Sequence, residues 1–302
     1  MSRMQRRVQQ GDERVFLSLR AVLMIGLAIL FLFPIVFMFV ASFKTDETEL
    51  LTSVRSVDAF LPVGQLGLEN YQGVFDRVPA PQFIFNSLIT TFATVILGLI
   101  VNSMAGFALS RLHWRGRDGV LTVIIATLIV PFETIAIPLL FVVIRLPWIW
   151  FSPETGLQLE WGWLNTYHVQ VLPFVVNAFS IFLFVQYFKS LPIDFDEAAR
   201  VDGASWFAIY RRVILPLSGP VIATVAILTF LPMWNAYLWP LMVTQTEAIR
   251  PVMVGLQYFF QLNVAWGEIM AYLSLITVPV LVLFLLLQRA FVESIAASGV
   301  KG

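Results

Sequence analysis

KSLPIDFDEAARVDGASWFAIYRRVILP, residues 189–216, is a strongly charged segment that lies between two apolar runs of the chain. Its four basic residues are Lys189, Arg200, Arg211 and Arg212, and its four acidic residues are Asp194, Asp196, Glu197 and Asp202. The runs on either side have the composition of segments in lipid, whereas this segment has the composition of a surface that contacts protein. We therefore predict that the apolar runs move a solute across a membrane and that residues 189–216 receive the force.

The overall composition is that of an integral membrane protein. Of the 302 residues, 59% are hydrophobic and 13% are charged, and the mean hydropathy is +0.83. A soluble domain has about 25% charged residues. The formal net charge is zero, which gives no indication of a nucleic-acid partner. The chain has no cysteine, so disulfides, thiolate metal sites and thiol nucleophiles are excluded.

Six apolar windows are long enough to cross a membrane as helices, which takes about 20 mostly apolar residues. They are Arg20–Phe43, Phe83–Leu109, Val120–Ile144, His168–Phe188, Leu217–Pro240 and Met270–Gln288. The first follows an arginine-rich tail, as a signal sequence does, but it is too long and no cleavage site follows it. The predicted fold class is an all-α integral membrane protein with six transmembrane helices.

Proline recurs within these windows, at Pro34, Pro131, Pro138, Pro173, Pro220, Pro232 and Pro279. A proline removes a backbone donor and kinks a helix. Kinked helices suit a pathway with gates, where neighbouring helices or a cavity satisfy the freed carbonyls. Proline is also simply commoner in membrane helices than in soluble ones, so both interpretations stay open.

Lysine and arginine predict the orientation, because short cytoplasmic loops carry an excess of them. Most of the 19 lie in the N-terminal tail, the loop after the second window, residues 189–216 and the C-terminal tail. We therefore expect both termini and the central loop in the cytoplasm. The predicted organisation is a cytoplasmic tail over residues 1–19, a six-helix domain over 20–291 that includes a long external segment at 44–82, and a cytoplasmic tail over 292–302.

The external segment before the fourth window is rich in aromatic residues, namely Trp148, Trp150, Trp161, Trp163 and Tyr167. Tryptophan and tyrosine prefer the membrane–water interface, which makes an aromatic belt the favoured interpretation. A docking surface for an external partner or a sugar is the alternative.

Motifs of catalysis and nucleotide binding are absent from the sequence. There is no G-x-x-x-x-G-K-[ST] phosphate loop, no G-x-S-x-G and no H-E-x-x-H. The two histidines, His113 and His168, have no second ligand at metal-binding spacing. We predict no catalytic, cofactor-binding or metal-binding residue and no enzyme activity. If nucleotide hydrolysis drives this protein, another chain binds the ATP and magnesium.

Residues 189–216 themselves predict two short helices outside the bilayer. Asp194 or Asp196 can cap the first helix, since acids in the first turn suit the helix dipole. Gly203 interrupts it, because glycine adopts backbone angles that other residues avoid. A second helix then runs from residue 204 to 213, and Pro216 marks its boundary. An amphipathic helix on lipid headgroups is the alternative that the residues alone leave open.

A family resemblance decides between these alternatives. The run E197-A198-A199-x-x-x-G203-x(9)-V213-x-L215-P216 resembles the "EAA" signature of binding-protein-dependent ABC importer permeases, with valine at 213 in place of the usual isoleucine. The wider chain is similar to the carbohydrate permeases of the maltose-transporter type. The supporting runs are Asn86-Ser87, Ala105 to Arg111, Trp163 to Thr166, Trp234-Asn235, Trp239 to Leu241 and Gly299 to Gly302.

The resemblance implies the type I ABC importer permease fold and a role for two segments. The signature element is the coupling helix that docks in a groove of a cytoplasmic ATPase. The implied ATPase-coupling residues are Glu197, Ala198, Ala199, Asp202, Gly203, Leu215 and Pro216. Glu197 makes a polar contact and Gly203 sets the bend. The tail residues Gly299, Val300, Lys301 and Gly302 reach toward the ATPase pair, unless they are simply a frayed end.

Four residues are candidates for the solute pathway. Glu133 lies between two prolines of the third window, where a carboxylate is costly and has to face protein or water. It either lines the pathway or is a structural glutamate bonded to another helix. Asn235 is a further buried polar candidate. Trp234 and Tyr237 could stack on sugar faces, although buried aromatics mostly serve packing.

The predicted function is the permease subunit of an ATP-driven importer that moves a carbohydrate into the cytoplasm, such as an oligosaccharide or a related polyol or glycoside. The implied partners are a second, paralogous permease subunit, two copies of a cytoplasmic ABC ATPase, an extracytoplasmic sugar-binding protein and the lipid bilayer of a bacterial or archaeal inner membrane. An importer permease for another solute, an ion-coupled secondary transporter and a membrane-embedded enzyme are the alternatives.

Overall fold

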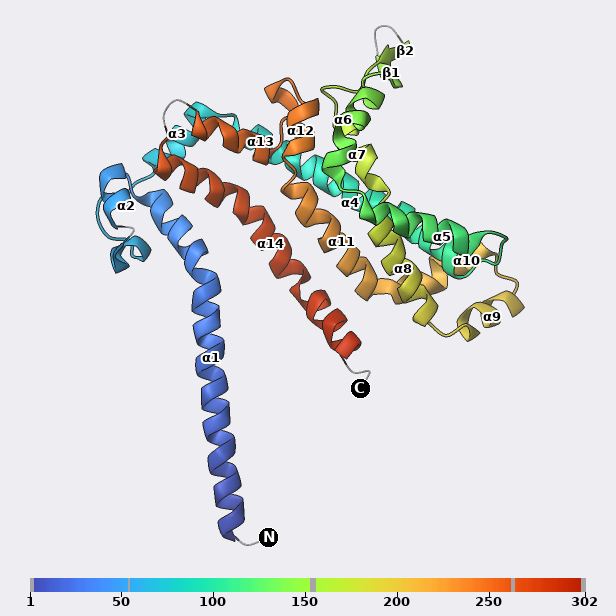
Figure 1. Ribbon diagram of the computed structural model, residues 1–302, viewed down its shortest axis with the longest axis horizontal. Helices are drawn as coiled ribbons and strands as arrows, with labels where there is room; N and C mark the ends of the chain where they lie inside the picture. The colour runs from blue at the N-terminus through green and yellow to red at the C-terminus, as the bar shows by residue number, and fades with distance from the viewer. Residues whose placement is uncertain (1–2, 54, 153–155, 262–263, 300–302) are drawn as a thin grey trace. The chain divides into compact units, whose positions relative to one another are not determined.

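The computed structural model describes residues 3–53, 55–152, 156–261 and 264–299 of the chain (Figure 1). These residues divide into two compact units. The first comprises residues up to Val78 together with Phe259–Val278, and the second comprises Pro79–Tyr258 together with the residues after Val278. We describe each unit separately.

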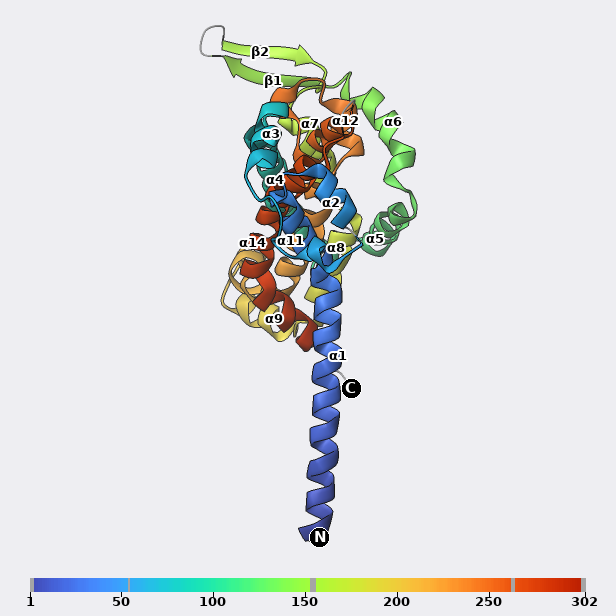
Figure 2. The same ribbon diagram turned by 90° about the vertical axis from the view of Figure 1, so that its left-hand side faces the viewer.

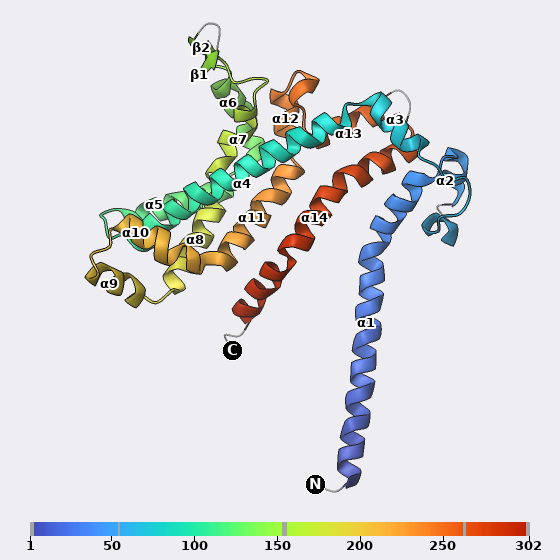
Figure 3. The same ribbon diagram turned by 180° about the vertical axis from the view of Figure 1, so that it is seen from behind.

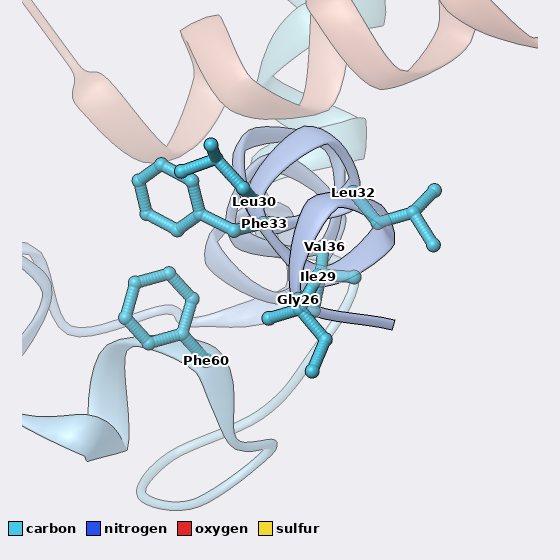
Figure 4. Close-up of a pocket in the computed structure, with 7 residues that line it drawn as sticks. All are labelled: Gly26, Ile29, Leu30, Leu32, Phe33, Val36 and Phe60. Carbon is cyan, nitrogen blue, oxygen red and sulfur yellow. The ribbon is translucent and has the colours of Figure 1, made fainter. Parts of the chain in front are cut away.

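The first unit is built on the long helix α1 (Arg3–Phe43), followed by α2 (Glu47–Ser53), the 3₁₀ turn η1 (Val57–Phe60) and α3 (Glu69–Arg77). Phe60 of η1 packs against Phe33 of α1, with ring centroids 5.2 Å apart, and completes an otherwise open apolar groove on α1 (Figure 4). The buried ammonium of Lys44 donates to the Asp58 carbonyl oxygen, 2.6 Å away. The predicted external segment 44–82 is therefore ordered as short helices joined by turns.

The second unit is organised around helix α4 (Ala80–Ser110). Helices α7 (Tyr167–Val175), α8 (Ala178–Ser190) and α11 (Gly219–Trp234) pack along it (Figure 3). Two glycines of α4 allow the close approach. A Cβ added at Gly106 would lie 2.5 Å from the Cβ of Phe184 on α8, and one at Gly98 would lie 3.3 Å from the Val175 carbonyl oxygen.

The remaining elements follow the same chain order. They are α5 (Arg117–Ala126), η2 (Thr127–Ile129), α6 (Phe132–Val143), β1 (Pro147–Ser152), β2 (Gly156–Trp161), α9 (Asp194–Val201), α10 (Trp206–Ile209), the π-helical turn η3 (Tyr210–Ile214), η4 (Pro216–Ser218), α12 (Leu238–Val243), η5 (Glu247–Ile249), α13 (Val252–Leu256), η6 (Gln257–Phe260) and α14 (Trp266–Gly299).

The predicted spans agree with the structure in place and in length. Within the described residues, four helical stretches are long and apolar enough to cross a membrane: Arg20–Phe43, Ala80–Ser110, Pro216–Trp234 and Trp266–Leu286. Two bent pairs pass the same test together, Arg117–Ile129 with Phe132–Val143 and Tyr167–Val175 with Ala178–Ser190. Each pair coincides with one predicted window, so six spans result if each pair counts as one.

One helix end differs from the prediction. Helix α11 ends at Trp234 rather than running to Pro240, and Trp239 lies in the separate helix α12. The predicted boundaries after residue 19 and after residue 291 fall inside the helices α1 and α14. Apolar composition locates a span well, but it does not show where backbone hydrogen bonding stops.

One strand pair is an exception to the all-α prediction. Strands β1 and β2 form an antiparallel hairpin, with Pro147 opposite Trp161 and Ser152 opposite Gly156 (Figure 2). The aromatic and β-branched residues of this segment favour a strand.

The two bends in the spans have different causes. The third span turns by 104° at Val130 and Pro131, where an extended residue and a proline end η2 and open α6. The fourth turns by 42° at Val176 and Asn177, after the internal Pro173. The buried amide of Asn102 on α4 donates to the Val175 carbonyl (2.9 Å) and accepts from the Asn177 N–H (3.0 Å). Lipid offers no such partner, so a neighbouring helix satisfies the broken backbone.

The close packing of α4 on α8 makes Gly106 sensitive to substitution. Gly106→Ala is expected to lower the free energy of unfolding by ~1–3 kcal/mol, because the added methyl overpacks the contact with Phe184. Gly119→Ala is the matched control, since its Cβ meets nothing within 4 Å and helix propensity alone predicts up to ~1 kcal/mol of stabilisation. Thermal unfolding in nanodiscs measures both, and equal midpoints for the two variants would contradict the packing argument.

Candidate functional site

Residues 189–216 fold as the predicted pair of short helices. Helix α9 carries Asp194, Asp196 and Glu197 in its first turn, where the helix dipole favours acids. The prediction that Asp194 or Asp196 caps this helix is wrong. Ile193 is the N-cap, without a side-chain bond, and the Asp196 side chain turns inward instead. The capped helix is α10, where the Ser205 hydroxyl accepts from the Ala208 N–H at 3.3 Å.

Gly203 forms the predicted bend between these helices. Its φ of +80° lies in the left-handed region, which glycine adopts without a steric penalty. Its N–H donates to the Arg200 carbonyl at 3.0 Å, and the Ala204 N–H donates to the Ala199 carbonyl at 2.9 Å. These two bonds satisfy the last carbonyls of α9 and terminate the helix, as a glycine after a helix end commonly does.

One side of the element is anchored in the core of the second unit. Ile209, Tyr210 and Ile214 are buried in a cluster with aromatic residues of α4 and α8. Ala199 and Leu215 pack against the same cluster. The Tyr210 and Ser103 hydroxyls are 2.8 Å apart, which links the π-helical turn η3 to α4.

A buried ion pair holds the other half of the element to α4. The Arg111 side chain, at the end of α4, reaches Asp196 of α9 with its Nη1 3.3 Å from Oδ2. Its Nη2 donates to the Leu191 carbonyl at 2.9 Å. Both side chains are 4% exposed. Neither carboxylate oxygen of Asp196 has a hydrogen-bond partner among the described residues, so the pair is held by charge rather than by a bidentate bond.

Burial dominates the electrostatics of this pair. Loss of hydration raises the pKa of Asp196 above its ordinary value of 3.8, although the Arg111 guanidinium acts in the opposite direction. The neighbouring Glu197 carboxylate raises the same pKa further. Ionising Asp196 therefore costs free energy in the folded chain, and Arg111 offsets only part of that cost.

The outer side of the element is apolar and uncovered. Val201 is 88% exposed and Phe207 is 61% exposed, and both belong to the predicted coupling segment. Ile193, Phe195 and Trp206 extend the same kind of surface. Glu197, Ala198, Asp202 and Pro216 are exposed as well. The Arg200 guanidinium lies over the Trp206 ring at 4.9 Å. Exposed large apolar groups of this number indicate a surface that another protein covers.

The pathway candidates do not form one cluster. Glu133 is exposed in the first turn of α6, just after the 104° bend, rather than in mid-helix. The prediction that Asn235 is buried is wrong, because it is exposed at the end of α11 and donates to the Leu231 carbonyl at 2.8 Å. Trp234 is buried and stacks on Phe230, which supports the packing interpretation. Tyr237 is exposed and donates to Gln257 at 3.0 Å.

The structure gives a role to two buried polar residues of α4, Asn86 and Ser87, which the sequence analysis names only as part of the family resemblance. Asn86 is fully buried, and its amide donates to the Ala248 and Arg250 carbonyls while its oxygen accepts from the Tyr167 hydroxyl. Ser87 accepts from the Val252 N–H at 2.9 Å. An amide within an otherwise apolar window was the available signal, because such a group needs a partner in lipid.

The predicted tail residues 299–302 lie at the end of the described chain or beyond it. Gly299 is the last residue of α14, and Val300, Lys301 and Gly302 lie outside the described residues. Within the described part of the chain, no group of three or more histidine, aspartate or glutamate side chains could hold a metal ion.

The chain resembles one well-defined family. The family model described as "Binding-protein-dependent transport system inner membrane component" matches residues 94–296. The arabinooligosaccharides transport system permease protein AraQ of Halalkalibacterium halodurans is 31% identical over 278 residues, covering 91% of this chain and 93% of that protein. The trehalose/maltose transport system permease protein MalG of Thermococcus litoralis is 30% identical over 299 residues, covering 96% and 98%.

A solved structure has the same fold. One chain of a bacterial ABC transporter involved in the import of the acidic polysaccharide alginate superposes with a TM-score of 0.75. It is 24% identical, and the match covers 93% of this chain and 98% of that one.

The Arg111–Asp196 pair is expected to be essential for the stability of the second unit. Asp196→Asn and Arg111→Gln should each lower the free energy of unfolding by ~3–5 kcal/mol, because each leaves one buried polar partner stranded. Replacing both with apolar residues, as Arg111→Met with Asp196→Leu, should cost less than either single change.

The neighbouring exposed pair Arg117–Asp118 provides the control. Asp118 is 83% exposed, so Asp118→Asn should change the free energy of unfolding by no more than ~0.5 kcal/mol. Thermal unfolding of the four variants in nanodiscs tests the assignment. If Asp196→Asn behaves like Asp118→Asn, the buried pair does not hold the element.

Proposed function

The chain belongs to the family of inner membrane components of binding-protein-dependent transport systems, and from this premise we propose that it is the permease subunit of an ATP-driven importer whose residues 189–216 couple ATP hydrolysis to transport. One observation carries the proposal. The element that matches the family signature is fastened to the core on one side and exposes a large apolar surface on the other. A segment that receives force from another protein needs both features.

A carbohydrate is the substrate class that the relatives support. Two relatives of at least 30% identity are named for transport of arabinooligosaccharides and of trehalose and maltose. The transporter with the same fold imports an acidic polysaccharide. We therefore propose that this chain carries a sugar, an oligosaccharide or a related glycoside. It is a transport subunit rather than an enzyme, and the proposal places ATP and magnesium in a separate ATPase chain.

The proposed force path starts at α9. A motion applied to α9 reaches α4 through Asp196 and Arg111, since a buried charge pair resists separation. A motion applied to α10 reaches α4 through the contact between Tyr210 and Ser103, and reaches α11 through the turns η3 and η4. Gly203 sets the angle between α9 and α10, the two helices to which the motion is applied. Packed elements of this kind transmit a displacement because they do not deform continuously.

The outer surface of the element is the proposed ATPase-docking face. It consists of the exposed apolar side chains Ile193, Phe195, Val201, Trp206 and Phe207, bordered by Glu197, Arg200 and Asp202. An apolar centre with a charged border is the usual anatomy of a specific protein interface. The alternative that the element rests on lipid headgroups is disfavoured, because Glu197 and Asp202 would then face anionic lipid.

The remaining partners and the orientation belong to the same proposal. The family description names a binding-protein-dependent transport system and an inner membrane. We propose a second permease subunit, two ATPase copies and an extracytoplasmic sugar-binding protein. Both chain ends and residues 189–216 lie on the cytoplasmic side, as the distribution of lysine and arginine predicts. The tail residues 299–302 remain a predicted second contact with the ATPase.

A secondary transporter is the weaker alternative. Coupling to an ion requires carboxylates near the membrane centre. Glu133 is the only acid of the predicted third window, Val120–Ile144, and it lies just after the break between η2 and α6. A carboxylate at that position either gates the pathway or stabilises the first turn of α6, and neither role requires ion coupling.

The docking face predicts the effect of adding charge. Val201→Glu and Phe207→Glu are expected to reduce the amount of ATPase that co-purifies with the chain by tenfold or more, because an unpaired buried charge costs over ~1.4 kcal/mol. The amount of chain in the membrane should stay unchanged, since both side chains are exposed.

Val57→Glu serves as the control for this experiment. Val57 is 73% exposed and lies in η1, outside the docking face. It should leave ATPase retention at the wild-type level. Full retention by both docking-face variants would remove the element from the ATPase interface.

Glu133 predicts a separate effect on transport. Glu133→Gln keeps the shape of the side chain and removes its charge. If this carboxylate lines the pathway, the variant should transport more slowly than wild type and with a different pH dependence, while ATPase retention is unchanged. Identical transport at every pH would remove Glu133 from the pathway. Vesicles loaded with ATP and supplied with binding protein and labelled sugar measure it.

A further inference from the structure

The β1–β2 hairpin exposes its apolar face, whereas a hairpin in water would expose its polar face. Residues directly opposite each other project to the same face of a strand pair. Pro147 pairs with Trp161 and Ile149 with Leu159, so one face is apolar, while the other carries Trp148, Gln158 and Glu160. The apolar face is largely uncovered, whereas Trp148 and Gln158 on the other face are half-buried. Ile149, Leu157, Leu159 and Trp161 are 59–76% exposed.

The base of the hairpin is fixed to the second unit, so this exposure is built into the fold. The rings of Trp148 and Trp163 both pack against His168 at the start of α7, each with centroids 4.9 Å apart. The Trp163 indole donates to the Pro147 carbonyl at 3.2 Å. The Gly162 N–H donates to the Leu146 carbonyl at 2.9 Å. The hairpin therefore presents one particular face.

The hairpin lies at the end of two membrane-spanning segments and crosswise to one of them. Three residues connect it to α6, and five connect it to α7. Figure 2 shows the strands running across the direction of α6. The exposed surface of α6 near this end is apolar too, with Ile137, Phe141 and Val142 uncovered. The apolar surface of the span thus continues along the chain into the apolar face of the hairpin.

Two features set the depth at which the hairpin can lie. A two-stranded ribbon has unpaired backbone groups along both outer edges, and these cannot enter hydrocarbon. Arg145, exposed just before β1, has the charge that pairs with lipid phosphate. Tryptophan at 161 prefers the same zone. Each feature fits the boundary between headgroups and acyl chains. The backbone edges and Arg145 exclude the bilayer centre, and the exposed apolar face disfavours bulk water.

We propose that the β1–β2 hairpin is an interfacial anchor, which lays its apolar face on the leaflet remote from the coupling element. The hairpin precedes α7 and the coupling element follows α8, so the two stand at opposite ends of the fourth span (Figure 1). The anchor holds the joined ends of the third and fourth spans at a constant depth while the coupling element moves. This role rests on the chain being in a membrane and not on the identity of its substrate or motor.

Docking of the binding protein explains the exposed apolar face of the hairpin less well than contact with lipid does. A binding protein comes and goes in each cycle, and a face without a charged side chain among its exposed residues would then be left in water. Burial of four large apolar groups against lipid is permanent and removes their surface from water throughout the cycle.

The chain's lack of cysteine makes the test direct. Ile149→Cys and Leu159→Cys place a bimane fluorophore on the apolar face, and Glu160→Cys places it on the other face as the matched control. The full chain is reconstituted with its partner subunits in nanodiscs of phosphatidylethanolamine and phosphatidylglycerol. Quenching is then measured with iodide in the water and with lipids brominated near the headgroup or near the chain end.

The anchor predicts a distinct pattern at the two faces. Bimane at 149 and at 159 should be quenched severalfold more by shallow brominated lipid than by iodide, and more by shallow than by deep bromine. Bimane at 160 should be quenched more by iodide than by brominated lipid. Two positions on the apolar face guard against one variant that folds poorly.

Three outcomes would overturn the anchor. Strong iodide quenching at 149 and 159 means that the face lies in water. Protection from both quenchers means that another subunit covers it. Protection from iodide that appears only when the binding protein is added means that the face is a docking surface.

Discussion

Backbone groups freed at the breaks of the spans need partners inside the protein, and helix α4 supplies them. At its start, the Asn86 amide donates to the Ala248 and Arg250 carbonyls and so holds the 248–250 turn, and the Ser87 hydroxyl accepts from the first N–H of α13. In its second half, Asn102 closes the bend between α7 and α8. At its end, Arg111 binds the carbonyl where α8 stops. These residues span ~37 Å of one helix, at 1.5 Å per residue. Water cannot replace them in lipid.

This arrangement gives the coupling element a rigid target. Because α4 carries the partners for several breaks, a displacement at Arg111 bears on the helix that also holds the bend of the fourth span. The pair with Asp196 is buried and yet poorly hydrogen-bonded. Separating such a pair is costly because it would leave a buried charge without a partner. In the proposed mechanism, the pair therefore follows a shift of α9, and the shift does not have to break a bidentate bond. The same low dielectric that raises the pKa of Asp196 also strengthens its attraction to Arg111.

Exposed apolar side chains have different meanings at the two ends of the fourth span. At the coupling element they lie among charged residues and between two helix ends, which indicates a protein partner. At the hairpin they form a face without charge and continue from the surface of α6, which indicates lipid. Composition is nearly the same in the two places. Charge at the border and the geometry of the backbone distinguish them.

The sequence by itself determined the membrane class, the place of the six spans, the bend at Gly203 and the position of the segment that carries the family signature. Those features depend on local composition, on the allowed angles of one residue and on a run of residues at constant spacing. Tertiary structure decided the rest. Whether Asp196 caps its helix or pairs with Arg111 depends on where α4 ends, 85 residues earlier in the chain. Whether the aromatic segment at 147–161 forms a hairpin, and which of its faces is uncovered, depends on the packing of Trp148 and Trp163 against His168. Partners so distant along the chain leave no periodic pattern in either segment, because each residue type is compatible with several contacts until the helices are packed.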